Sequence, residues 1–117
     1  MRSEKIQKRA ARVGFDWPNP HDVVEKIREE VVEVEQELIA GNQEKLEEEI
    51  GDLLFSVVNL ARKAKIDSEL ALQNATAKFT SRFHKVEAIL RQRGIAFENS
   101  NLEQLDQIWN EVKSAEL

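Results

Sequence analysis

Four acidic residues on two segments of the chain have the spacing of a helical metal site: Glu30, Glu33, Glu49 and Asp52. Each residue advances about 100° around a helix, so Glu30 and Glu33 lie about 60° and 120° from the centre of the apolar face of their segment. Glu49 and Asp52 take the same offsets of about 60° and 120° on the next segment. If the two apolar faces pack together, the four carboxylates meet, and their repulsion is costly unless protons or a cation neutralise them.

A site made only of carboxylate oxygens suits Mg²⁺ or Mn²⁺ better than zinc, and Mg²⁺ commonly takes phosphate oxygens as further ligands. Asp52 stands among apolar neighbours. Gly51 gives up about 1 kcal/mol of helix propensity relative to alanine, which suggests that another backbone or a ligand approaches closely there. A helical di-iron site is disfavoured because it needs Glu-x-x-His pairs, and the chain offers only the reversed His84-x-x-Glu87. On spacing alone, a solvated acidic surface is an equal alternative to a metal site.

Other side chains are suited to an anionic ligand that carries an aromatic ring. Phe15 and Trp17 can stack on a nucleobase, because an aromatic face binds any base, or they can simply pin the N-terminal helix. Asn59, two turns after Asp52, is a candidate contact to the base or sugar. Residues at i, i+4 and i+8 can hold a chain of phosphates, although spacing alone favours a solvent-facing polar stripe: Asn74, Lys78 and Arg82.

Helices must position these residues, because glycine and proline are scarce. The chain has four glycines and two prolines, and both prolines lie in Trp17-Pro18-Asn19-Pro20. This pattern predicts an all-α fold, an antiparallel bundle of about five helices. The expected helices are 3–13, a second that begins at Asn19 or His21 and ends before Gly41, then 43–65, 68–93 and 101–115.

Apolar residues at steps of three and four define the faces expected to be buried, and the second and third helices are expected to pack as an antiparallel pair. On these two helices the faces comprise Val24, Ile27, Val31, Val34 and Leu38, and Leu46, Ile50, Leu53, Val57, Leu60 and Ala64. On the fourth and fifth helices they comprise Leu72, Ala75, Phe79, Phe83, Val86 and Leu90, and Leu105, Ile108 and Val112.

Composition narrows the class of protein. A chain of 117 residues predicts one domain, 1–117, and a net charge of −5 disfavours a nucleic acid polymer as partner. The chain has no cysteine, and it shows neither a signal peptide nor a membrane span, so a cytoplasmic protein is expected. The third helix is apolar around most of its circumference, which predicts a homodimer or larger homo-oligomer; burial by the two terminal helices is the alternative.

The sequence motifs resemble those of a known enzyme family. Glu29-Glu30-Val31-Val32-Glu33, followed after fifteen residues by Glu49-Ile50-Gly51-Asp52, matches the E-E-x-x-E and E-x-x-D motifs of all-α nucleoside triphosphate pyrophosphohydrolases. Further blocks occur in the right order: Arg9 to Pro18, Leu46 to Phe55, Lys78-Phe79-x-x-Arg82-Phe83 and Trp109-x-x-x-Lys113. Over nearly its whole length the chain is similar to the MazG family, specifically to the C-terminal catalytic domain of MazG.

The resemblance implies a reaction and roles for its residues. A nucleoside triphosphate would be hydrolysed between its α- and β-phosphates with Mg²⁺ or Mn²⁺, the metal held by Glu30, Glu33, Glu49 and Asp52. Glu29 or Glu33 would be the general base. The polar stripe would bind the triphosphate, and Trp109 and Lys113 would contact the nucleotide; the alternative for Trp109 is a core residue that anchors the terminal helix. A narrower pyrophosphatase for deoxyuridine or deoxycytidine nucleotides is the alternative among enzymes, and a non-catalytic helical oligomerisation module is the alternative outside them.

Overall fold

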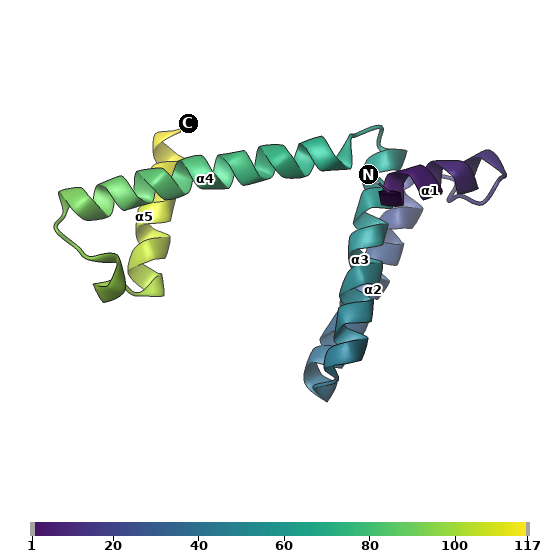
Figure 1. The fold of residues 1–117 in the computed structure, drawn as a ribbon, viewed down its shortest axis with the longest axis horizontal. Helices are drawn as coiled ribbons and strands as arrows, with labels where there is room; N and C mark the ends of the chain where they lie inside the picture. The colour runs from purple at the N-terminus through teal and green to yellow at the C-terminus, as the bar shows by residue number, and fades with distance from the viewer. Residues whose placement is uncertain (1, 117) are drawn as a thin grey trace. The chain divides into compact units, whose positions relative to one another are not determined.

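The computed structural model describes residues 2–116. Within that range the chain forms α-helices, one short 3₁₀ helix and no strand, which confirms the all-α class (Figure 1). No helix in the described part of the chain combines the length and apolarity needed to cross a membrane. The elements are α1 (Arg2–Arg12), α2 (Pro20–Ala40), α3 (Gln43–Lys63), α4 (Ser68–Gln92), η1 (Phe97–Asn99) and α5 (Leu102–Ala115).

Local signals explain where the helices begin and end. Asn19, rather than His21, caps α2, because its side-chain oxygen accepts a hydrogen bond from the backbone N–H of Asp22 at 3.1 Å. Asn42 caps α3 in the same way. Between these helices Gly41 has φ = 72°, a left-handed conformation that glycine adopts without strain, and its N–H bonds the carbonyl of Glu37. The tight turn makes α2 and α3 antiparallel neighbours.

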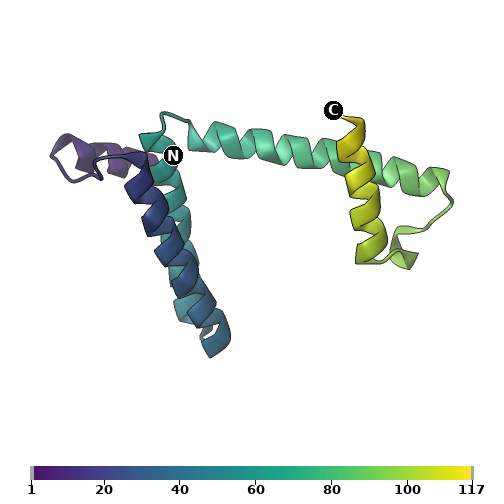
Figure 2. The same ribbon diagram turned by 180° about the vertical axis from the view of Figure 1, so that it is seen from behind.

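The chain divides into two compact units, the first ending at Ala71 and the second beginning at Leu72. In the first unit α2 and α3 lie side by side, and α1 packs on α3 (Figures 1 and 2). The predicted antiparallel pair is therefore present, and it supplies the framework on which the acidic residues stand.

The line of closest contact between α2 and α3 differs from the predicted one. The side chains buried on these helices are Val23, Glu30, Ser56 and Asn59. Several residues of the predicted apolar faces are instead exposed: Val31, Leu38, Ile50 and Val57. A pair of helices buries only the narrow strip along which they touch, so a broad apolar face cannot be covered by one neighbour. The contact strip is thus more polar than the periodicity indicated.

The second unit has its own apolar core. Val86 and Leu90 from α4 pack against Ile108 and Val112 from α5, as the periodicity predicted for these positions. The N-terminal half of the predicted α4 face is exposed, however: Leu72 and Phe79 are not buried. The side chains buried between α4 and α5 come from the C-terminal half of α4, while Phe79 contacts α5 through its ring alone, 5.2 Å from that of Trp109.

Candidate metal centre and loop pocket

Three carboxylates converge between α2 and α3. Glu30, Glu49 and Asp52 each offer one oxygen, and these oxygens all lie within 4.8 Å of one another. Their arrangement follows from the antiparallel pairing, because Glu30 lies on the contact strip of α2 while Glu49 and Asp52 are one turn apart on α3. Three of the four residues predicted as metal ligands are therefore brought together. Oxygen donors at this separation match the preference of hard divalent cations.

The fourth predicted ligand, Glu33, lies against Glu49. The two carboxyl groups are within hydrogen-bonding reach, and this contact raises the pKa of Glu49 to about 7. Partial burial of Glu49 raises the pKa further, as do the negative charges of Glu33, Glu30 and Asp52. Glu49 therefore holds a proton at pH values where a carboxyl group in water is ionised. The proton offsets charge that a metal ion could offset instead.

The cluster contains carboxylate oxygens that no donor satisfies. Glu30 is only 4% exposed, and one of its oxygens pairs with the ammonium group of Lys26 at 3.1 Å. The Oε2 atoms of Glu30 and Glu49 are buried and have no hydrogen-bond partner among residues 2–116. Buried acceptors without partners are costly. A bound cation would remove that cost, so the residues present fit a divalent metal.

Lys26 was not predicted as part of this site. Its pKa is raised chiefly by the hydrogen bond to Glu30, with smaller contributions from the charges of Glu30, Glu29 and Glu33. Lys26 and Glu30 are four residues apart, so the pairing rule for helices could have identified the contact. What the sequence could not indicate is that Glu30 is buried, because burial depends on the rotation of α2 against α3.

Two expectations about neighbouring positions differ from the structure. Asp52 is exposed despite its apolar neighbours in sequence, and a Cβ atom added at Gly51 would meet nothing within 4 Å. The close approach of another backbone that was expected at Gly51 is therefore not found within the described residues. Glu29, a candidate general base, is largely exposed; one of its oxygens lies 3.8 Å from the Lys26 ammonium, outside the group of converging carboxylates.

The residues proposed to contact a base gather elsewhere in the first unit. Phe15, Trp17 and Asn59 line one cavity of about 220 Å³, together with Gln7 of α1 and Phe55 of α3. We call this cavity the loop pocket. Its walls come from α1, from the connector between α1 and α2, and from the second half of α3. Segments far apart in sequence thus place the two aromatic rings and the Asn59 amide around one space.

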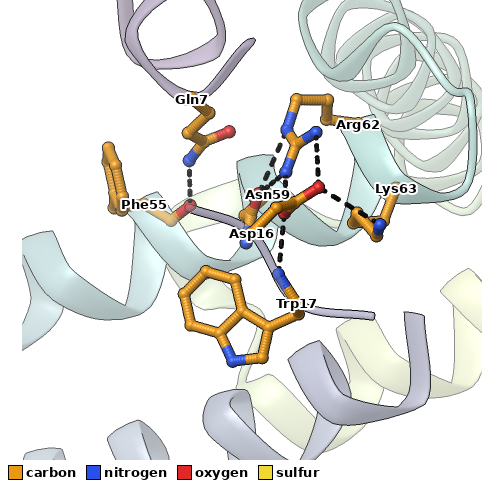
Figure 3. A network of polar contacts seen from close by, with 7 residues as sticks. All are labelled: Gln7, Asp16, Trp17, Phe55, Asn59, Arg62 and Lys63. Carbon is orange, nitrogen blue, oxygen red and sulfur yellow. Dashed lines mark hydrogen bonds and ion pairs between the residues drawn. The ribbon is translucent and has the colours of Figure 1, made fainter. Parts of the chain in front are cut away.

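A polar network holds the connector on α3 (Figure 3). The Asp16 carboxylate accepts hydrogen bonds from Arg62 at 2.5 and 3.3 Å, from Lys63 at 3.2 Å and from the backbone N–H of Trp17 at 2.9 Å. The Arg62 contact holds the pKa of Asp16 below its usual value, with Lys63 assisting. Arg62 also donates to Oδ1 of Asn59 at 2.7 Å. Because Oδ1 of Asn59 accepts this bond, the amide is oriented and its Nδ2 group is the end that can donate to a ligand.

The remaining predicted site residues belong to the second unit, on α4 and α5. Arg82 and Trp109 come together: the guanidinium carbon lies 5.8 Å from the centre of the indole ring. Arg82 also pairs with Glu116 at 3.0 Å. The others are exposed on the surfaces of their helices and are not gathered into this contact: Asn74, Lys78 and Lys113.

Comparison with known proteins supports the family that the acidic motifs resemble. Residues 19–87 match the family described as the MazG nucleotide pyrophosphohydrolase domain. The chain is 48% identical over 119 residues to the nucleoside triphosphate pyrophosphohydrolase of Escherichia coli (strain K12), covering 100% of this chain and 45% of that protein. It is 44% identical over 114 residues to the nucleoside triphosphate pyrophosphohydrolase/pyrophosphatase MazG of Thermotoga maritima, covering 97% of this chain and 44% of that protein.

A third relative is the protein YabN of Bacillus subtilis (strain 168), which bears the description uncharacterized; it is 40% identical over 77 residues, 66% of this chain and 16% of that protein. The chain spans less than half the length of each of these curated relatives. The family match covers α2, α3 and most of α4, and so includes every residue of the carboxylate cluster. The chain therefore belongs to the MazG nucleotide pyrophosphohydrolase domain family.

Proposed function

We propose that this protein hydrolyses nucleoside triphosphates to nucleoside monophosphates and pyrophosphate, with Mg²⁺ as its metal and Mn²⁺ as a substitute. The observation that carries the proposal is the carboxylate cluster, in which oxygens of Glu30, Glu49 and Asp52 lie within 4.8 Å of one another. Buried oxygens without donors and a proton held on Glu49 are properties expected of a cation site. Membership of a nucleotide pyrophosphohydrolase family supports the choice of substrate.

In the proposed reaction, water attacks the α-phosphorus and the bond from that atom to the bridging oxygen of the β-phosphate breaks. Pyrophosphate leaves with the bond's electron pair. Glu30, Glu33, Glu49 and Asp52 would hold Mg²⁺, which when bound supplies positive charge toward the phosphate oxygens and makes water more acidic. We assign the general base to Glu33 rather than Glu29, because Glu33 lies against Glu49 of the cluster whereas Glu29 lies beside Lys26 and outside the cluster.

The cationic residues of the second unit would bind the triphosphate. Arg82 offers a planar guanidinium group for phosphate oxygens, and Lys78 and Lys113 offer ammonium groups, with Asn74 as a neutral donor. Arg82 already lies against Trp109, which would contact the nucleotide. Arg82 pairs with the carboxylate of Glu116, and in the proposed complex a phosphate oxygen would replace that carboxylate.

The loop pocket would receive the base. Phe15 and Trp17 would stack on the ring, and the Nδ2 group of Asn59 would donate a hydrogen bond to it. At about 220 Å³ the cavity is smaller than the pockets of roughly 300–1,000 Å³ that enclose drug-sized ligands, so it suits one ring system rather than a whole nucleotide. The proposal also includes a homodimer or larger homo-oligomer, a cytoplasmic location and a role in controlling the nucleotide pool.

The test is pyrophosphate release from a panel of ribo- and deoxyribonucleoside triphosphates, with and without Mg²⁺. Glu30→Ala and Asp52→Ala should each reduce turnover about a hundredfold or more, because charge stabilisation in the transition state is lost. Glu30→Gln repeats the measurement without a change of side-chain volume, and Glu47→Ala, an exposed substitution on α3, is the matched control. Helical circular dichroism verifies folding.

Two results would contradict the proposal. Retained turnover in both alanine variants would show that the cluster does not hold the catalytic metal. Absence of pyrophosphate release from every triphosphate, together with no stabilisation by Mg²⁺, would indicate a helical interaction module. Activity restricted to deoxyuridine or deoxycytidine triphosphate would instead identify the narrower pyrophosphatase.

A further inference from the structure

Gln7 occupies an unusual position in α1. It is the one buried residue of that helix, at 6% exposure, although the helix is rich in charged side chains. Apolar residues ordinarily anchor a helix of this kind to its neighbour. Here the anchor is an amide, whose Nε2 donates to the backbone carbonyl of Phe55 at 2.9 Å. That carbonyl lies within α3, so one side chain joins the two helices.

The other end of the same amide has no partner. The Oε1 atom of Gln7 is buried and accepts no hydrogen bond from any residue in the described range 2–116. Figure 3 shows the amide nitrogen directed at the Phe55 carbonyl while the oxygen points away from it. Leaving such an acceptor unsatisfied costs about 1–3 kcal/mol. Most buried polar atoms in proteins have a hydrogen-bond partner, so an acceptor left without a protein donor is a position where a ligand donor would be favourable.

The surroundings of Gln7 indicate what that partner is. Gln7 lines the loop pocket with Phe15 and Trp17. Asp16 also borders it, but its carboxylate already accepts hydrogen bonds from Arg62, Lys63 and the Trp17 N–H. Arg62 carries only donor groups and cannot accept a hydrogen bond. Phe15 is 77% exposed and can close over a ring with little loss of packing. A ring held in this pocket would lie beside Gln7, a lining side chain whose amide oxygen has no partner in the described range.

We infer that Gln7 determines base specificity by accepting, at Oε1, a hydrogen bond from an N–H group on the edge of a base held in the loop pocket. The inference rests on the proposed nucleotide function and extends it to a residue on α1. The bond to Phe55 commits Nε2, so Oε1 is the end of the amide that is left for a ligand. A base without an N–H group at this position would leave the acceptor unsatisfied and would be rejected.

The experiment varies the residue and the ligand donor together, using the full chain with Mg²⁺. ATP is paired with purine riboside triphosphate, GTP with its N1-methyl analogue, UTP with its N3-methyl analogue and CTP with its N4,N4-dimethyl analogue. In the wild type, loss of the donor should lower kcat/KM for the preferred nucleotide about tenfold or more. In Gln7→Met the natural nucleotide and its analogue should agree within about twofold, because the acceptor has gone.

Stability provides an independent readout. Gln7→Met keeps the length of the side chain and removes both the unsatisfied acceptor and the hydrogen bond to Phe55. Because these two effects are opposite in sign and similar in size, the Tm of the free protein should stay close to that of the wild type. If Gln7 served only to hold α1, the variant would melt at a lower temperature and lose activity equally toward every nucleotide. Gln7→Leu repeats both measurements with a different shape, and Gln107→Met, an exposed site on α5, is the control for the substitution itself.

The outcomes separate this inference from the proposed function. The role of Gln7 is supported if the preference for the natural nucleotide over its analogue disappears in Gln7→Met and persists in Gln107→Met. Hydrolysis that discriminates equally well in Gln7→Met, or a wild type that accepts every analogue, overturns the role of Gln7 and leaves the proposed function intact. Absence of hydrolysis of any triphosphate by the wild type overturns both.

Discussion

Glu49 carries the largest electrostatic perturbation at the scale of single residues. Its pKa is about 7, against an ordinary value of 4.5, because Glu33 lies within hydrogen-bonding reach and other carboxylates surround it. The folded state therefore favours the protonated form. The stability gained from protonated Glu49 is fully present below about pH 4.5 and is lost as the pH rises through about 7. Mg²⁺ requires the ionised carboxylates, so metal binding and protonation compete.

This competition predicts a pH dependence of stability. The Tm of the metal-free protein should fall as the pH rises from about 5 to about 8, and Mg²⁺ should raise the Tm more at the higher pH. Thermal unfolding across that range, with EDTA or with Mg²⁺, measures both effects. Glu49→Gln should flatten the metal-free profile. A wild-type profile as flat as that of the variant would contradict the assignment of the proton to Glu49.

The sequence did not determine how each helix is rotated about its own axis, and this rotation decides which carboxylates are buried. The spacing of Glu30, Glu49 and Asp52 predicted that they would meet, because helical geometry fixes which residues share a side. It could not predict that Glu30 would be buried and Asp52 exposed, since a small rotation exchanges such positions. Gln7 carried no signal at all, because a lone glutamine on a charged helix is ordinary.

At the scale of elements, the connector between α1 and α2 depends on one carboxylate. Asp16 accepts bonds from Arg62, Lys63 and the backbone of Trp17. Asp16→Asn should lower the free energy of unfolding by about 1–3 kcal/mol, because charge-assisted hydrogen bonds become neutral ones. The value of KM should rise severalfold with kcat nearly unchanged, since the loop pocket loses its wall. Urea unfolding and steady-state kinetics measure these effects.

The pH dependence of stability tests whether the charge of Asp16 is responsible for this effect. The lowered pKa of Asp16 means that its stabilisation is present above about 4 and is lost as the pH falls below that value. Asp16→Asn should therefore lose less stability on acidification than the wild type. Glu25→Gln, which removes a carboxylate from an exposed pair with Arg28, should have little effect. Equal losses in the two variants would show that the network does not anchor the connector.

Helix boundaries were the most predictable feature of the elements. Asn19, Asn42 and Gly41 have strong local preferences, and each lies at a boundary in the structure. The contact strip between α2 and α3 was less predictable, because both helices carry apolar residues on more than one side. Leu38 and Ile50 were expected to be buried and are exposed, since a single neighbouring helix covers too little of each surface.

For the whole molecule, the exposed apolar surface of α3 predicts self-association. Leu54 is 62% exposed, and Ile50, Phe55 and Val57 on the same helix are exposed as well. The wild type should have the mass of a dimer or larger assembly by light scattering, and Leu54→Lys should shift it toward the monomer. Glu47→Lys, an exposed change on the same helix, should leave the mass unaltered. A monomeric wild type would contradict this prediction.

The way α1 is attached has a consequence for local opening. Because Gln7 is its only buried residue and bonds α3 through a single amide, detaching α1 exposes little apolar surface. Segments with so few buried contacts open by themselves, far below the free energy of global unfolding. The amide protons of α1 should therefore exchange with deuterated solvent before those of α3. A base that bonded Gln7 would slow this exchange, so nucleotide recognition would tighten the N-terminal helix onto the rest of the first unit.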